Sequence, residues 1–244
     1  MKKLHLVMPM GGSGLRFSKE GFEVPKPLIQ INNKPFFVWS AYSITKFIDV
    51  IDITFVVLQE HVNKFNIDKI IVDYFPFAKI IIIPHVLDGA ALTCLEACKT
   101  INDNNYILFN DCDHMFKSSS LNDFFFHINQ CDAGLVTFES NEPQFSFIEF
   151  DERGNIIGTK EKQCVSNRAI VGAYLFKNAS LYKQVCQEYL QECNYSEFFV
   201  SGIFNIICRH HGIVKEFSVD FHVNYGTPVE YEAAKKSCHF SELI

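Results

Sequence analysis

Apolar and polar positions follow two different periods along the first half of the chain. Short apolar runs typical of buried strands occupy residues 4–9, 53–58, 78–83 and 106–110. Between them, apolar residues recur at helical spacing over 35–47, 60–73 and 88–101, and Asp88 is the candidate N-cap of the last of these helices. This alternation of strand and helix predicts a parallel sheet with helices packed on its faces.

The pattern changes after residue 119. We expect a helix near 120–130, a strand at 133–138, and a hairpin within 145–162 that turns at the sequence DERGN. A strand at 169–176, helices around 178–192 and 196–211, and short strands complete the chain. Because no linker or repeat interrupts it, the sequence predicts one mixed α/β domain over 1–244, with a first half (1–118) and a hairpin-bearing second half (119–244).

Composition narrows the class of protein. The chain has 244 residues, of which 48% are hydrophobic, and its formal net charge is -6. It can therefore build a full core, and it lacks the basic surplus of nucleic-acid-binding proteins. The longest aliphatic run, IIIIPHV at 80–86, is too short to span a bilayer, and the cysteines are scattered without a disulfide pattern. We expect a cytoplasmic protein that binds neither nucleic acid nor membrane.

A glycine-rich loop follows the first strand, in the sequence MPMGGSGLRF at 8–17. The Walker A pattern G-x-x-x-x-G-K-S/T does not occur in the sequence. The loop also departs from the Rossmann fingerprint, because Phe17 stands where the third glycine should let helix and strand pack closely. What is left is a polar loop in which Arg16, Lys26 and backbone N–H groups would hold a triphosphate. The alternative is an ordinary glycine turn with two surface cations.

The longer segment MGGSGLRFSKEGFEVPKPLIQINNKPFFVW resembles the opening of the sugar-phosphate nucleotidyltransferases, whose pattern is G-G-x-G-x-R, a gap, P-K, and then a second K-P. The resemblance implies a single Rossmann-like domain of the GT-A type, with a mixed, mostly parallel sheet flanked by helices. It also implies a metal-dependent reaction of a nucleoside triphosphate with a phosphorylated sugar or polar alcohol, giving a nucleotide-linked sugar for surface polysaccharides. Enzymes of this family often form oligomers, so a homo-oligomer is left open.

The resemblance assigns the first half to the nucleotide. Arg16 would stabilise the leaving phosphates and Lys26 the charge that grows on the α-phosphate. Gly89 begins the segment GAALTCLEA, which matches the helix start beside the nucleoside, and His85 is the side chain nearest to the family's base-reading glutamine. The nucleotide-binding residues implied in this way are Met10, Gly11, Gly12, Ser13, Gly14, His85, Gly89 and Ala90.

Two carboxylates follow the strand YILFN, and the resemblance implies that Asp113 binds Mg²⁺ there. Asp111 either assists or is simply solvated. Carboxylates just past the end of a parallel strand lie where ligands of α/β proteins collect, and Mg²⁺ prefers carboxylate and phosphate oxygens. Asn224 stands where sugar-1-phosphate enzymes usually have a second metal-binding aspartate.

The second half would bind the acceptor. In the segment GTKEKQ, the resemblance implies that Glu161 binds the hydroxyls of the acceptor and that Lys162 binds the acceptor's phosphate. Lys160 is the alternative candidate for the phosphate. Gly172 belongs to the family's Gly-x-Tyr-x-Phe strand, and Asn224 completes the acceptor side. Two other readings are open: a cytidylyltransferase for a choline-like or amino-alcohol phosphate, and a non-catalytic nucleotide-binding protein.

Overall fold

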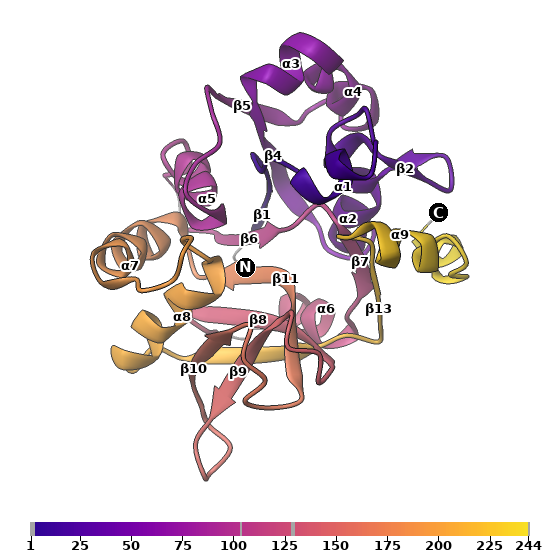
Figure 1. The fold of residues 1–244 in the computed structure, drawn as a ribbon. Helices are drawn as coiled ribbons and strands as arrows, with labels where there is room; N and C mark the ends of the chain where they lie inside the picture. Colours follow the sequence, from indigo (N-terminus) through magenta and orange to yellow (C-terminus); the bar gives the residue numbers. More distant parts are fainter. Residues whose placement is uncertain (1–2, 103, 128–129, 244) are drawn as a thin grey trace.

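A computed structural model describes residues 3–102, 104–127 and 130–243. A nine-stranded sheet runs through the molecule in the order β10-β9-β11-β6-β1-β4-β5, with β8 beside β11 and β12 beside β8 (Figure 1). The strands from the first half of the chain pair in parallel. They are β1 (Leu4–Met10), β4 (Val50–Leu58), β5 (Lys79–Ile83) and β6 (Tyr106–Asn110). These are the four strands that the apolar runs predict.

Mostly antiparallel pairing extends the same sheet into the second half of the chain, although β12 lies parallel to β8. The strands there are β8 (Ala133–Glu139), β9 (Ser146–Phe150), β10 (Ile156–Glu161), β11 (Arg168–Phe176) and β12 (Val214–Ser218). β9 and β10 form the predicted hairpin, and β11 lies antiparallel to both β6 and β8. The α/β fold with a mixed sheet flanked by helices is therefore confirmed.

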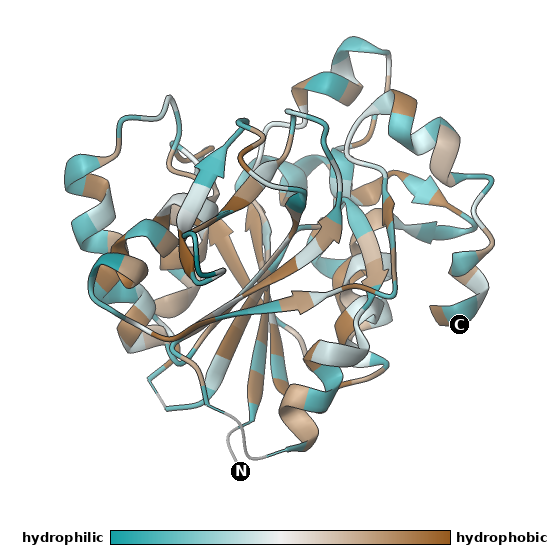
Figure 2. Cartoon of the chain, turned by 90° about the horizontal axis from the view of Figure 1, so that it is seen from below, coloured by the Kyte–Doolittle hydropathy of each residue, from teal (hydrophilic) through white to brown (hydrophobic). Residues whose placement is uncertain are grey.

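Helices cover both faces of the sheet. Successive residues of a strand point to opposite faces, so each buried strand packs against both helical layers. On one face, Val7 packs with α5 (Ala90–Cys98), α7 (Ala179–Glu192) and α8 (Val200–Arg209). On the other, Leu6 and Met8 pack with α2 (Phe36–Thr45), α4 (Ile67–Tyr74) and α6 (Ser119–Phe126). The strands between these layers are largely hydrophobic (Figure 2). Within the described ranges, no helix is long and apolar enough to span a bilayer.

Shorter elements lie beside the main layers, and most of them contribute to a third, largely aromatic cluster. They are α1 (Leu15–Lys19), the 3₁₀ turn η1 (Lys26–Leu28), β2 (Gln30–Ile31), β3 (Lys34–Pro35), β7 (His114–Lys117), β13 (Phe221–Asn224), α9 (Pro228–Ala234) and η2 (His239–Leu243). Phe17 is buried there, with its ring centroid 5.1 Å from Phe22, 5.8 Å from Phe36 and 6.3 Å from Tyr231. The bulky residue in the glycine loop therefore anchors the loop to this aromatic cluster.

Several boundaries differ from those predicted. The helix expected at 60–73 is two helices, α3 (Gln59–Phe65) and α4, because Asn66 adopts a left-handed conformation between them. Gly89, not Asp88, is the N-cap of α5. The helix expected at 196–211 begins only at Val200. The helix expected near 120–130 ends at Phe126, and residues 128–129 of that prediction lie outside the described residues.

A part-buried contact between a histidine and an aspartate lies in the β1–β4 register. His5 and Asp52 are partners in that register, and their Nδ1 and Oδ1 atoms are 2.7 Å apart. Burial alone would raise the pKa of Asp52, but His5 and Lys79 hold that pKa below its usual value. Asp52 therefore stabilises the fold above pH 4 or so, and this contribution is lost as the pH falls through the lowered pKa.

We expect Asp52→Asn to lower the free energy of unfolding by about 1–2 kcal/mol at pH 7 and by much less near pH 3. Urea unfolding at the two pH values measures the difference. Asp49→Asn, at an exposed position just before β4, is the control and should change little at either pH. A deficit of the same size at both pH values would contradict this account.

Candidate active site

Two cavities meet above the carboxyl ends of the parallel strands, where α/β proteins commonly bind ligands. One, of about 570 Å³, is lined by the glycine loop, Lys26 and the start of α5. The other, of about 520 Å³, is lined by Glu161, Lys162 and residues of the β13–α9 segment. We call them the first and the second cavity. Ala90, Asp111, Asp113 and Phe199 line both, so the carboxylates lie at the boundary between the cavities.

Most residues predicted to bind the nucleotide line the first cavity. These are Met10, Gly11, Gly12, Ser13, Gly89 and Ala90, together with Lys26. Two predicted residues do not line this cavity. Gly14 is the N-cap of α1, and His85 is exposed to solvent. Arg16 projects from α1 and lines the second cavity. The structure therefore brings the glycine loop, Lys26 and the α5 start together, and leaves His85 apart.

Main-chain hydrogen bonds fix the backbone of the two aspartates. The Asp111 N–H donates to the Gly172 carbonyl at 2.9 Å, and the Tyr225 N–H donates to the Asp113 carbonyl at 3.0 Å. Gly172 has a φ of 96°, and a Cβ at this position would lie 2.7 Å from Asp111 Oδ2. A side chain there would displace the carboxylate, so glycine at 172 sets the position of Asp111.

Lys26 and Asp113 form an ion pair in which Nζ lies 2.7 Å from Oδ2, and their side chains are 27% and 23% exposed. Burial alone would lower the pKa of Lys26, but the Asp113 carboxylate raises it above its ordinary value. Burial alone would likewise raise the pKa of Asp113, but Lys26 lowers it. Lys26 is therefore protonated and Asp113 ionised at neutral pH.

Asp111 differs from its neighbour. Burial, and next the charge of Asp113, raise the pKa of Asp111 to about 7. Two carboxylates this close repel each other unless a cation joins them. Among the described residues, no group of three or more His, Cys, Asp or Glu side chains is arranged to hold a metal. The pair nevertheless fits Mg²⁺, which takes few protein carboxylates and completes its shell with water and phosphate oxygens.

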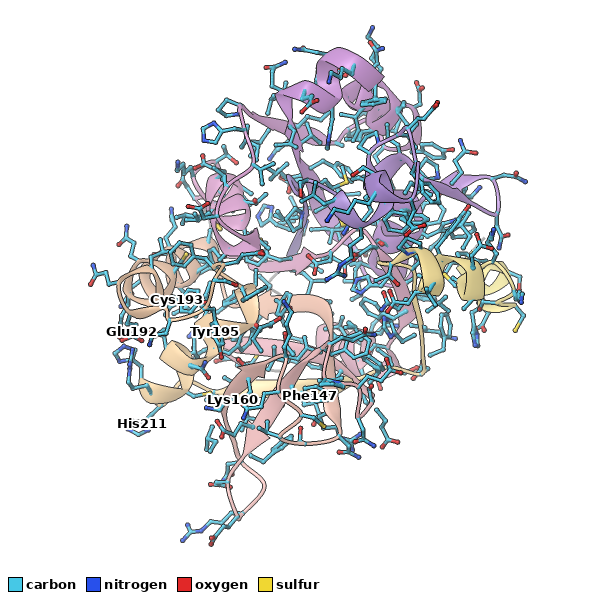
Figure 3. The ribbon with its side chains drawn as sticks, in the orientation of Figure 1. Phe147, Lys160, Glu192, Cys193, Tyr195 and His211 are labelled. Carbon is cyan, nitrogen blue, oxygen red and sulfur yellow. The ribbon has the colours of Figure 1, made fainter. Side chains whose placement is uncertain are left out.

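The second cavity holds the remaining predicted residues: Glu161, Lys162, Gly172 and Asn224. Glu161 Oε2 accepts hydrogen bonds from Ser146 and, at 3.0 Å, from Ser201 Oγ, so its carboxylate is fixed at the end of β10. The rival Lys160 projects from the hairpin sheet (Figure 3), where its Nζ lies 3.4 Å from Glu149, and it does not line the cavity.

Asn224 belongs to a hydrogen-bonded group that lines the second cavity. Its Nδ2 donates to Glu230 Oε1 at 2.7 Å, and Gln144 Nε2 donates to the same oxygen at 3.1 Å. The Gly226 N–H donates to Asn224 Oδ1 at 3.2 Å. The amide at 224 is therefore oriented by Glu230, whose carboxylate adds a negative charge beside it.

The nucleotidyl transferase family model matches residues 6–236. The chain belongs to the nucleotidyl transferase family. The match covers nearly the whole chain, as the resemblance implies, and no curated protein matches the chain in sequence.

Solved structures share the fold of this nucleotidyl transferase family member. A nucleoside-diphosphate-sugar pyrophosphorylase from Vibrio cholerae RC9 is 19% identical, with a TM-score of 0.80 over 95% of this chain and 100% of that chain. An inositol-1-phosphate CTP transferase from T. maritima is 15% identical, with a TM-score of 0.77 over 99% and 94%. A UDP-glucose pyrophosphorylase complexed with UDP-glucose is 17% identical, with a TM-score of 0.75 over 99% and 100%. At these identities the likeness shows the fold alone.

Some residues that line the cavities of this family member are not predicted from its sequence. Phe199 and Glu197 follow α7 in a stretch whose apolar pattern looks like the start of a helix, so nothing in the pattern marks them as cavity residues. Glu230 has a detectable signal, because Thr227 and Glu230 form the T-x-x-E pattern of a helix N-terminus. That pattern predicts α9, although it does not predict that the carboxylate turns towards Asn224.

Gly89 lines the first cavity in a backbone conformation that requires glycine. Its φ of 121° and ψ of 164° are accessible essentially to glycine only, and a Cβ would lie 2.5 Å from the Phe198 backbone. We expect Gly89→Ala to destabilise this family member by about 3 kcal/mol in urea unfolding.

The matched control is Gly12→Ala, where a Cβ meets nothing within 4 Å. The control should unfold within about 0.5 kcal/mol of the wild type. If Gly89→Ala were equally mild, the close approach between α5 and Phe198 would not be a feature of the protein in solution.

Proposed function

We propose that this protein joins a nucleoside triphosphate to a phosphorylated sugar, releasing pyrophosphate and a nucleotide-linked sugar. One observation carries the proposal. Two cavities of suitable size share Asp111 and Asp113, and each has a lysine of its own, Lys26 in the first and Lys162 in the second. This arrangement suits two phosphorylated substrates whose reacting phosphates meet at the shared carboxylates.

The chemistry would be an in-line displacement at the α-phosphorus. An oxygen of the acceptor phosphate forms the new P–O bond, and the bond from the α-phosphorus to the bridging oxygen breaks, so that pyrophosphate leaves with its electron pair. The attacking oxygen is already ionised, so no general base is required. Positioning and charge neutralisation carry such transfers.

The residues would divide this work. Lys26 would neutralise charge on the α-phosphate, and Lys162 would bind the phosphate of the acceptor. Arg16 would stabilise the departing phosphates from its place in the lining of the second cavity. Glu161 would accept hydrogen bonds from acceptor hydroxyls, as its fixed carboxylate allows. Asp113 and Asp111 would hold Mg²⁺, which when bound neutralises phosphate charge.

A second candidate is a cytidylyltransferase for a non-sugar alcohol phosphate. The fold is similar to that of an inositol-1-phosphate CTP transferase. The second cavity is also lined by the carboxylates of Glu161 and Glu230 and by Phe145, and residues of these kinds suit a positively charged acceptor group. The free cysteines support a reducing, cytoplasmic location for the protein. We also propose that its product is a precursor for surface polysaccharides.

The test is a screen for pyrophosphate release with Mg²⁺ present. ATP, CTP, GTP, UTP and dTTP are each paired with sugar 1-phosphates and with alcohol phosphates, including phosphocholine. Release that depends on one matched pair supports the transfer and separates the two candidates. Nucleotide binding without release from any pair would overturn the proposed transfer and favour a binding protein on this fold.

A further inference from the structure

The segment Glu197–Phe199 connects the walls of the two cavities. Its middle residue is fixed to the start of α5, because the Phe198 N–H donates to the Asp88 carbonyl and the Ala91 N–H donates to the Phe198 carbonyl, each at 2.9 Å. The next side chain, Phe199, lines both cavities. Tyr195, on the same connection between α7 and α8 (Figure 3), brings its hydroxyl to within 3.5 Å of the Glu161 backbone nitrogen.

Lys162 is held in an unusual backbone conformation next to this segment. Its φ is 54°, in the left-handed region that residues other than glycine, asparagine and aspartate seldom adopt. Its N–H donates to the Phe145 carbonyl at 3.0 Å, which fixes the chain at the end of β10. Strained positions of this kind persist where the surrounding structure requires them and cluster at functional sites.

The Lys162 ammonium lies over an aromatic ring. Its Nζ is 5.1 Å from the centroid of Phe199, within the range of a cation–π contact. Among the described residues, no carboxylate lies within ion-pair distance of Lys162, whereas Lys26 is paired with Asp113. The two cavity lysines are therefore held in two different ways, one by a carboxylate and one by a ring face.

We propose that Phe199 is a positioning residue that holds the Lys162 ammonium ready for the phosphate of the acceptor. This inference rests on the proposed function, in which Lys162 binds that phosphate. A carboxylate in the place of the ring would neutralise the ammonium and repel an incoming dianion. The ring face attracts the cation but brings no net charge, so the positive charge stays available to the ligand.

The kinetic test compares Phe199→Leu, which keeps apolar bulk but removes the ring, with Phe199→Tyr, which keeps the ring. We expect Phe199→Leu to raise the KM for the acceptor about fivefold to tenfold, with a much smaller change in kcat. Phe199→Tyr should stay within about twofold of the wild type. Equal losses in the two variants, or an unchanged acceptor KM in Phe199→Leu, would overturn the proposal.

The matched control is Phe47→Leu. The Phe47 ring also makes a cation–π contact, because Lys117 Nζ lies 5.8 Å from the centroid of the ring. Phe47 lines neither cavity. This variant loses a contact of the same kind and should keep the wild-type KM for the acceptor. A rise equal to that of Phe199→Leu would mean that the effect is not specific to the site, and would also overturn the proposal.

A second readout does not depend on transfer activity. The ε-methylene NMR signal of Lys162, assigned by its absence in Lys162→Met, should be shifted upfield by the ring in the wild type and in Phe199→Tyr. It should lose that shift in Phe199→Leu. Titration with inorganic phosphate should move this signal at lower concentrations in the wild type than in Phe199→Leu.

The two readouts separate this proposal from the one on which it rests. A wild type that releases no pyrophosphate, but whose Lys162 signal responds to phosphate as expected, would refute the proposed transfer and uphold the role of Phe199. No ring shift in the wild type, or identical phosphate titrations in the two proteins, would refute the role of Phe199 whatever the activity.

Discussion

Lys26→Ala is expected to slow pyrophosphate release by about 10³-fold, the scale on which enzymes lose activity when one preorganised charge stabiliser is removed. Among the described residues that line the first cavity, Lys26 is the one lysine or arginine, and its Nζ lies 2.7 Å from Asp113 Oδ2. Because both side chains keep about a quarter of their surface exposed, at 27% and 23%, solvent screening should limit the cost in unfolding free energy to about 1 kcal/mol. The defect should therefore appear in turnover rather than in stability.

Lys34→Ala is the control for this loss. Lys34 follows in the same stretch of chain and lies 5.6 Å from the Trp39 ring, but it lines neither cavity. Turnover by Lys34→Ala should equal that of the wild type. A Lys26→Ala enzyme that kept turnover within about tenfold of the wild type would show that the first cavity does not use this charge.

Asp113→Asn should be as damaging to turnover, about 10³-fold, and should also weaken metal binding. Asparagine keeps the shape and still accepts a hydrogen bond from Lys26, so the change removes charge with little change in packing. Calorimetry with Mg²⁺ or Mn²⁺ should show an affinity loss at least as large as the roughly 10–100-fold that outer-shell partners of a metal ligand cost. The pKa of Asp111, which burial and then the Asp113 charge raise to about 7, should fall in this variant.

Asp73→Asn, at an exposed position on α4, removes an equal charge away from both cavities and serves as the control. It should leave turnover and metal affinity unchanged. Metal binding by Asp113→Asn that equalled the wild type would remove Asp113 from the proposed metal site, even if turnover were lost.

Much of the first half of the fold can be predicted from local pattern. The strands that become β1, β4, β5 and β6 are apolar runs because helices cover both faces of that part of the sheet. The break at Asn66 is not visible in this way. The apolar spacing continues through it, since Ile67 and Ile71 are buried in the core, and only the left-handed conformation of Asn66 separates the helices.

The candidate site is harder to predict, because pairing between distant strands assembles it. Asp111 and Gly172 are 61 residues apart in sequence, and they meet because β11 lies antiparallel to β6, which no local signal specifies. Phe199 is missed for another reason. Its segment has the apolar spacing of the helix that follows, yet Phe198 bonds to Asp88 and Ala91, and the helix starts only at Val200.

The antiparallel neighbours β6 and β11 join the two halves of the chain into one sheet. Asp111 directly follows β6, and Gly172 lies in β11, so the elements that carry the two cavities are separated by a single strand spacing of about 4.8 Å. Within the described residues, one hydrogen-bonded sheet therefore connects the elements that line the two cavities. In the proposed reaction, this sheet would set the spacing of the two phosphates, and closing over the substrates would then be expected from the loops around the cavities.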